Sequence, residues 1–299
     1  MHQLRVSKVA SNTMTLCLCA TASISDARLS PPRVRFTPVT ASTAPSCGPE
    51  IANLDALRDA PMILLGELHG LEAAPAFAID LACRLATTAK PVLLALEIPR
   101  QEQGRIDAFL GSSGGAPNEA ALLDGPFWRR EFQDGRSSRA RLALLDVARA
   151  LRAQRLPIRV VAVDDADVPS PARDSAMAAM LLAARKPGET AVFLVGDLHA
   201  RTRPGAPWNR NIVWAGVRLR SQEPRLLSLD NRFLGGETWM CLGNAPSDCG
   251  IKTVKGRGGT SGFRIERFAA TDSIGFDGMF DIGPATPSLP AREDMRIRR

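Results

Sequence analysis

Four short apolar runs, separated by segments with helical periodicity, dominate the sequence between residues 61 and 196. The runs are of strand length and lie at residues 61–66, 91–97, 157–163 and 190–196. Parallel strands need a crossover between them, and an α-helix is the usual crossover. Strand and helix alternating four times therefore predict an α/β fold, with a mostly parallel central sheet and helices on both faces.

The segments between the runs carry the helical signals. Residues 72–88 and 137–154 have apolar side chains at helical spacing. A third helix is predicted to open at Ser170-Pro171, as N-cap and first-turn residue, and to end at Pro187. A short helix and then a glycine-rich loop are expected between the second run and residue 137.

After residue 199 the pattern changes from alternation to short strands. Strands are expected at 211–219, 225–229 and 263–268, which makes the C-terminal part β-rich. The segment 239–250 is typical of two strand ends joined by a turn. It holds Cys241 and Cys249, which we predict to form a disulfide that closes this hairpin if the protein is exported.

The ends of the chain differ in composition from its body. Residues 1–27 resemble a weak signal peptide, and residues 28–50, rich in Pro, Ser and Thr, are expected to be a flexible linker. A single α/β domain is expected over 51–285, followed by a basic disordered tail over 286–299. Export implies a periplasmic or secreted protein, with a cytoplasmic one as the alternative. No apolar run is long enough for a transmembrane helix.

The charge balance is basic, with a formal net charge of +7, but its pattern does not favour a nucleic-acid partner. Arginine accounts for 33 of the 38 basic residues, which are scattered along the chain. The sequence has no tyrosine, and aromatic residues are not interleaved with the basic ones as base-stacking surfaces require. We therefore expect a small molecule or a peptide as substrate.

Two of the four strand-like runs end in nearly the same phrase. The first is followed by Gly66, Glu67, a leucine and His69, and the second contains Gly196 and is followed by an acid, a leucine and His199. The chain has three histidines, and the third, His2, lies in the predicted leader. Both histidines of the predicted domain therefore share one sequence context, which indicates a shared site.

Ligands of open parallel sheets bind beyond the carboxyl ends of the strands. Titratable side chains follow all four runs at this edge, and Arg173 is expected nearby in the first turn of the third helix; the candidates are Glu67, His69, Glu97, Asp164, Asp165, Asp197, His199 and Arg173. Two imidazoles with carboxylates suit a divalent transition metal such as Zn, Mn, Co or Fe. The same set could activate water without a metal.

The ordered set of motifs resembles a known superfamily. It comprises Leu-Leu-Gly-Glu67-Leu-His69-Gly, Glu97 after the second strand, Arg173-Asp-x-x-Met-Ala, and Val-Gly-Asp-Leu-His199-Ala. Together these are similar to the EreA/ChaN-like superfamily, which unites erythromycin esterases, ChaN haem-binding lipoproteins and Tiki/TraB proteins. The resemblance covers roughly residues 60–230 and implies a parallel-centred α/β sheet.

The resemblance implies a site more firmly than a reaction. Its Tiki-like members suggest a metal site at Glu67, His69, Glu97 and His199, and its erythromycin esterases suggest a hydrolytic water at the same residues. From their place at the sheet edge, Asp164 is a further candidate metal ligand and Arg173 a further candidate catalytic residue. The expected function is a metal-assisted hydrolase of the peptidase or esterase type. The alternative is a ChaN-type protein that binds haem or iron through His69 and His199 without catalysis. The absence of a lipid-anchor motif and of tyrosine departs from the ChaN pattern.

Overall fold

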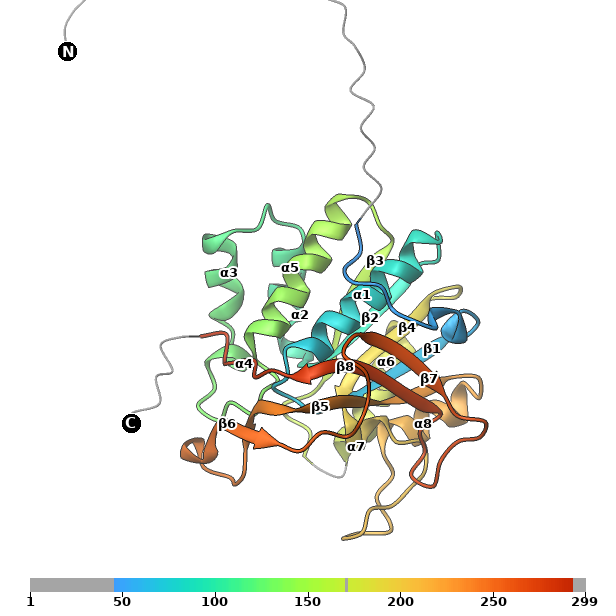
Figure 1. Ribbon diagram of the computed structural model, residues 1–299. Coiled ribbons are helices and arrows are strands. Elements are labelled where there is room, and N and C mark those ends of the chain that lie inside the picture. Colours follow the sequence, from blue (N-terminus) through green and yellow to red (C-terminus); the bar gives the residue numbers. More distant parts are fainter. Residues whose placement is uncertain (1–45, 170–171, 293–299) are drawn as a thin grey trace, which may run out of the picture. The chain divides into compact units, whose positions relative to one another are not determined.

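The computed structural model describes residues 46–169 and 172–292, which fall in one compact unit (Figure 1). The predicted leader, the Ser170-Pro171 helix start and residues 293–299 lie outside the described residues. The strands are β1 (Met62–Glu67), β2 (Val92–Pro99), β3 (Ile158–Asp164), β4 (Thr190–Gly196), β5 (Leu227–Cys241), β6 (Cys249–Val254), β7 (Phe263–Arg267) and β8 (Gly278–Ala285).

These strands form one eight-stranded sheet in the order β3-β2-β4-β1-β5-β8-β7, with β6 paired to β5. All neighbours are parallel except the pairs β5–β6 and β7–β8. The predicted α/β fold with a mostly parallel sheet is thereby confirmed, as is its β-rich C-terminal part.

Helices cover both faces of the sheet. One face carries α1 (Ala73–Thr87), α2 (Gln103–Leu110), α3 (Ala116–Leu123), α4 (Pro126–Arg129) and α5 (Arg139–Ala153). The other face carries α6 (Ala172–Ala184) and α8 (Ala215–Gln222), and the single turn α7 (Asp197–Ala200) follows β4 directly. Short 3₁₀ turns lie at Leu54–Leu57, Arg100–Glu102 and Pro246–Asp248.

The double cover explains why the central strands are apolar at every position. In β1, Ile63 and Leu65 point into the core under α1 and α5, whereas Met62 and Leu64 point into the core on the α6 side. Successive side chains of a strand alternate between its faces, so both sets are buried. Each fully buried aliphatic side chain of this kind contributes about 1.5–3 kcal/mol.

Helix α5 shows how an amphipathic sequence places a functional residue. Ser138 is its N-cap, and its hydroxyl accepts a hydrogen bond from the Arg141 backbone N–H at 3.3 Å. The buried face holds Leu144, Leu145, Ala148 and Leu151. Arg141 lies on the same face and is only 1% exposed, so one guanidinium enters the interior with the apolar stripe.

Three details of the predicted secondary structure need correction. The strand expected at 211–219 is wrong, because the helix α8 (Ala215–Gln222) begins within this segment, and its Ala215 and Leu219 pack at helical spacing on the α6 side. A short apolar run carries no periodicity that separates a strand from a buried helix. The predicted glycine-rich loop contains α3 and α4, each of which has a proline in its first turn. No strand was predicted at the position of β8.

The described body also extends beyond its predicted boundaries. Cys47, placed in the linker, forms a disulfide with Cys83 of α1. Residues 286–292 are not part of a tail: Ser288 is 1% exposed, its backbone N–H donates to Gly70 O, and its hydroxyl accepts from Ala140 N. The predicted Cys241–Cys249 disulfide is present.

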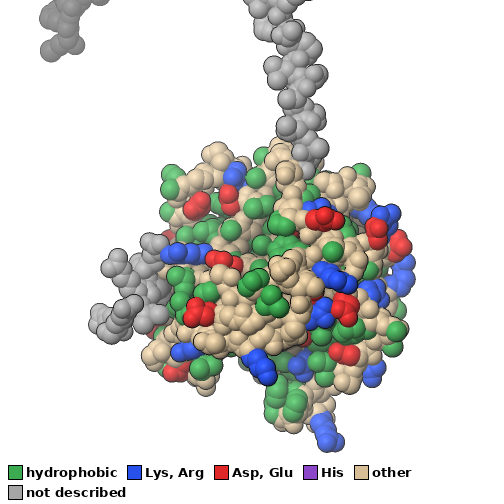
Figure 2. Space-filling view, in the orientation of Figure 1, with side chains coloured by type: hydrophobic (Ala, Val, Ile, Leu, Met, Phe, Trp, Pro, Cys, Tyr) green, Lys and Arg blue, Asp and Glu red, His purple; other side chains and the backbone are tan. Residues whose placement is uncertain are grey.

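The surface mixes charges of both signs. On the face in Figure 2, Lys and Arg side chains lie among Asp and Glu side chains and apolar ones. Within the described residues, no helix has the length and apolar character to cross a membrane.

Candidate active site

A crevice of about 370 Å³ lies beyond the carboxyl ends of the central strands. Its polar floor comes from Glu67, His69, Glu97, Arg173 and His199. Its apolar sides come from Leu68, Phe132, Leu198 and Met240. This is the position that the fold class predicts for a ligand.

Gly196 occupies the centre of the crevice floor. Its strand β4 lies between β1 and β2, which carry Glu67 and Glu97. A Cβ atom on Gly196 would stand 3.0 Å from His69 Nε2 and 3.5 Å from a ring carbon of His199. Both imidazoles therefore border the same small space, which stays open because residue 196 has no side chain.

His69 is held between two carboxylates. Its Nδ1 lies 3.1 Å from Glu67 Oε1, and its Nε2 lies 3.4 Å from Glu97 Oε2. Burial by itself would lower the pKa of His69, but the charge of Glu97 and the hydrogen bond to Glu67 outweigh it and raise the pKa to about 9. His69 is consequently an imidazolium at neutral pH.

His199 has different partners and a different protonation state. Its Nδ1 lies 2.8 Å from Asp174 Oδ1, and its Nε2 lies 3.2 Å from Arg173 Nη1. A carboxylate only accepts hydrogen bonds and a guanidinium only donates them. These partners therefore assign the proton to Nδ1 and leave the Nε2 lone pair as an acceptor, which makes His199 a neutral imidazole.

Two arginines neutralise the acids beside these histidines. Glu97 Oε1 accepts from Arg173 Nη2 at 2.5 Å and from Arg136 Nη1 at 3.0 Å. Both guanidiniums also bind Asp164, which lies beneath the crevice. Burial would raise the pKa of Glu97, but His69 and Arg136 hold it well below its usual value. Its other oxygen, Oε2, accepts the Gly196 backbone N–H at 2.8 Å.

Glu67 is supported from below by the interior arginine of α5. The Arg141 guanidinium donates to Glu67 Oε1, and both side chains are almost fully buried. Burial raises the pKa of Glu67, but the charge of Arg141 and the hydrogen bond to His69 outweigh it, so the net shift is downward. Glu67 is thus an anion that orients His69.

The structure brings together the predicted residues Glu67, His69, Glu97, Asp164, Arg173 and His199. It does not bring Asp165 to them: this carboxylate accepts from Arg100 and Gln101 outside the crevice. Asp197 lines the crevice and pairs with Arg257 at 3.3 Å. Whether these residues act in catalysis or binding stays a prediction.

Four charged residues of the site are absent from the sequence-based set: Asp134, Arg136, Arg141 and Asp174. For Arg141 a signal existed, because a basic residue interrupts the apolar stripe of a helix. For Asp174 the signal was its place beside Arg173 in the motif. Asp134 and Arg136 lie in an irregular loop, which has no periodicity to read.

Comparison with known proteins supports the fold and leaves the reaction open. No family model matches the sequence, and no curated protein matches it. Among solved structures, an erythromycin esterase, EreC, in its open conformation superposes with a TM-score of 0.58 at 11% identity, over 78% of this chain and 93% of that one. The chain has the erythromycin esterase fold. The fold expected from the superfamily resemblance is therefore confirmed.

Other proteins share the erythromycin esterase fold with this chain. A succinoglycan biosynthesis protein superposes with a TM-score of 0.58 at 10% identity, over 79% of this chain and 91% of that one. A Bacillus cereus protein gives a TM-score of 0.52 at 12% identity, over 81% and 94%. At such identities the likeness concerns the fold alone, and this fold is one that a hydrolase uses.

The superfamily resemblance implies a divalent metal, whose ligands would be the carboxylates and imidazoles of this crevice. Arg136 and Arg173 donate hydrogen bonds to the two carboxylate oxygens of Asp164 and to Glu97 Oε1. Arg141 donates to Glu67 Oε1. Among the described residues, no group of three or more His, Cys, Asp or Glu side chains is arranged to hold a metal ion. In this arrangement the side chains do not fit a metal unless an arginine moves aside.

We expect His69 to make the free energy of unfolding fall as the pH rises from about 6.5 to about 9. Its folded-state pKa of about 9 exceeds the ordinary value of about 6.5 in an unfolded chain, so its contribution is complete below this window and is lost as the pH rises through it. The loss is on the order of 3 kcal/mol at most, since one pKa unit corresponds to about 1.4 kcal/mol.

Urea unfolding at a series of pH values across this window measures the effect. His69→Gln serves as the comparison, because it removes the titrating group and keeps a polar side chain of similar reach. The difference between the two curves should be confined to the window. An equal fall in stability in both proteins would contradict the assignment.

Proposed function

We propose that this protein is a hydrolase that cleaves an ester or amide bond by activating a water molecule between His199 and His69. The observation that carries the proposal is the opposite protonation of the two histidines in one crevice. Partner geometry leaves His199 Nε2 as an unprotonated acceptor, and flanking carboxylates keep His69 protonated. A base and an acid side by side are the arrangement that general acid–base catalysis uses.

His199 acts as the general base in this proposal. Asp174 fixes its tautomer and stabilises the imidazolium that forms when water gives up a proton, as the acid of a catalytic triad does. In the resting arrangement Arg173 Nη1 donates to His199 Nε2. Water reaches Nε2 when this contact lengthens, and an anionic oxygen on the substrate gives Nη1 another acceptor.

His69 and Arg173 act on the substrate side. The tetrahedral intermediate of ester or amide cleavage carries a negative oxygen, which fixed cationic donors stabilise. His69 supplies one such donor, and it can also return a proton to the leaving group. Glu67 and Glu97 hold His69 in its charged form and in place.

Water, rather than a side chain, is the proposed nucleophile. Among residues 46–169 and 172–292, those that line the crevice include no serine, threonine or lysine, and the sulfur of Cys241 is in a disulfide. The described lining of this crevice therefore offers none of the usual covalent nucleophiles of acyl transfer.

A substrate panel in ¹⁸O-labelled water tests the proposal. Nitrophenyl esters of graded acyl length, lactones and peptide nitroanilides are offered to the protein and to His199→Ala. We expect turnover of at least one class, with one labelled oxygen in the acid product, and a loss of about 10²–10⁴-fold in kcat in the variant. Asp165→Asn is the matched control, because its buried carboxylate has partners outside the crevice.

Two results would overturn the proposal: no turnover of any class, or equal turnover by the protein and by His199→Ala. The same preparations test the predicted cofactors. Metal analysis and hemin titration on the protein, His69→Ala and His199→Ala show whether a transition metal or haem binds through these histidines. Activity that survives a chelator would favour the metal-free mechanism.

The Cys47–Cys83 and Cys241–Cys249 disulfides support a location in an oxidising compartment. We therefore propose that the protein works in the periplasm or outside the cell. Its substrate would be a small molecule or a peptide that reaches it there.

A further inference from the structure

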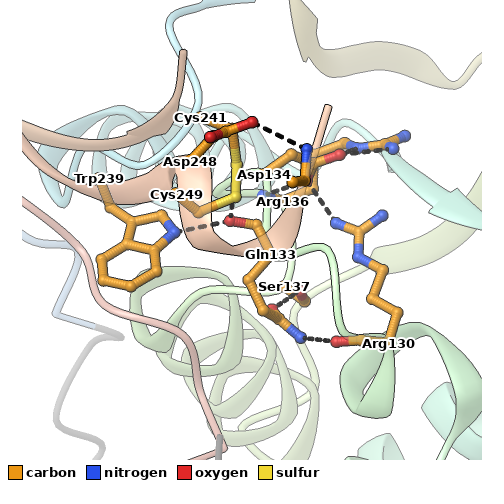
Figure 3. The surroundings of a disulfide bond; sticks show 10 residues. Arg130, Gln133, Asp134, Arg136, Ser137, Trp239, Cys241, Asp248 and Cys249 are labelled. Atoms are coloured by element: carbon orange, nitrogen blue, oxygen red, sulfur yellow. Dashed lines mark hydrogen bonds and ion pairs between the residues drawn. A yellow bond between two sulfur atoms is a disulfide. The ribbon is translucent and has the colours of Figure 1, made fainter. Parts of the chain in front are cut away.

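A hairpin and a loop from distant parts of the chain meet at the rim of the crevice. The hairpin is β5–β6, whose facing residues Cys241 and Cys249 are joined by a disulfide. The loop, which we call the rim loop, comprises residues 130–138 between α4 and α5. Figure 3 shows the disulfide directly beside Gln133 and Asp134 of this loop.

Gln133 connects the hairpin to the rim loop. Its backbone carbonyl accepts the Trp239 indole N–H at 2.6 Å and lies 3.4 Å from Cys241 Sγ. Its side-chain amide donates to the carbonyls of Trp128 and Arg130. Gln133 is only 4% exposed, so it is a buried junction between the two segments (Figure 3).

The rim loop continues from this junction to the floor of the crevice. Asp134 Oδ2 accepts from Arg136 Nε at 3.0 Å and from Arg136 Nη2 at 2.8 Å. The remaining nitrogen, Nη1, donates to Glu97 Oε1 and to Asp164 Oδ2, each at 3.0 Å. All three guanidinium nitrogens are thereby engaged, and the side chain has one defined orientation.

The backbone between Asp134 and Arg136 is packed too closely to accept a side chain at Gly135. Gly135 has φ of +93°, and a Cβ atom there would stand 2.6 Å from the Gly70 backbone nitrogen. Gly70 in turn follows His69, and its carbonyl accepts from Trp239 N at 3.2 Å. The hairpin, the rim loop and the segment after His69 thus pack backbone against backbone.

From these contacts we propose that Arg136 is a positioning residue for Glu97 and His69, and that the disulfide-closed hairpin fixes Arg136 through Gln133. The proposal rests on the hydrolase function proposed above. The disulfide spans a sequence separation of 8 residues and limits the excursions of the hairpin next to the junction. Without it, the rim loop gains freedom, and the acid that holds His69 loses one of its two arginine partners part of the time.

Hydrogen exchange tests the structural half without any substrate. The variant Cys241→Ser/Cys249→Ser is compared with Cys47→Ser/Cys83→Ser, which removes the disulfide that lies away from the crevice. We expect amide exchange in residues 130–138 to rise at least several-fold in the first variant and to stay unchanged in the second. Unchanged exchange in the first variant overturns the proposal, whatever the fate of the hydrolase assignment.

Kinetics on the substrate found with the panel test the positioning half. Arg136→Ala and Cys241→Ser/Cys249→Ser should lower kcat by about tenfold or more with little change in KM, because small displacements of catalytic groups reduce the rate steeply. Arg136→Lys should recover part of kcat, since an ammonium can still reach Glu97. A faster-exchanging rim loop with an unchanged kcat would show that Arg136 does not position the site. Loss of thermal stability alone, without the kcat effect, would show the same.

Discussion

Replacing Asp174 by asparagine is expected to lower kcat by about 10²–10⁴-fold, on the scale that loss of an orienting carboxylate has in a catalytic triad. Asp174 Oδ1 accepts from both His199 Nδ1 and the Ala215 backbone N–H. An asparagine oxygen in the place of Oδ1 can keep both hydrogen bonds, but the side chain carries no charge. The imidazolium that forms when His199 takes a proton from water then loses the carboxylate that stabilises it.

The tautomer of His199 should not change in this variant, because Arg173 still donates to Nε2. Nitrogen chemical shifts of the imidazoles report the tautomer directly and need no substrate, so they separate the loss of charge from a loss of orientation. The kinetic comparison is with Asp165→Asn, which should stay close to the parent. A normal kcat in Asp174→Asn would show that the charge of Asp174 does not support a base at His199.

The convergence of the candidate residues in one crevice follows from the sequence, because strand and helix periodicity place them at the ends of neighbouring strands. The run 190–196 is confirmed as β4 with the same limits, and Gly196 ends it directly beneath His69. Parallel pairing then forces Glu67 to lie opposite Gly196. Residues at the ends of neighbouring strands can be placed in this way without knowledge of any long-range contact, and for this reason His69, Glu97 and His199 can be predicted to lie close together.

The partners of these residues are harder to predict, because tertiary packing selects them. Arg136 reaches Glu97 across a sequence separation of 39 residues from an irregular loop. Asp174 reaches His199 only because α6 packs beside the end of β4. The mistaken strand at 211–219 has the same origin: isolated apolar residues fit either element, and packing against α6 favours the helix α8.

The buried pair Arg141–Glu67 should give the largest effect on stability. We expect Arg141→Met and Glu67→Gln each to reduce the free energy of unfolding by about 3–5 kcal/mol, because each leaves a charge without its main partner in the interior. The double variant should recover much of this loss, since no unpaired charge remains. Unfolding in urea measures all three proteins, and the double-mutant cycle gives the coupling.

The exposed pair Arg58–Asp55 is the matched control. Its side chains are 68% and 83% exposed, and Arg58→Met should change stability by less than about 1 kcal/mol. A coupling between positions 141 and 67 as small as this would mean that the two charges are separately solvated. It would also mean that Arg141 does not stabilise the charge of Glu67.

The same cycle separates stability from function. If the double variant is as stable as the parent, the ion pair is not needed for folding, and apolar or neutral groups can replace it. His69 would nonetheless lose the carboxylate at its Nδ1, and its pKa would fall. A folded double variant with diminished hydrolysis would therefore indicate that Arg141 is retained to keep Glu67 ionised beside His69, so that α5 contributes a charge to the crevice from within the core.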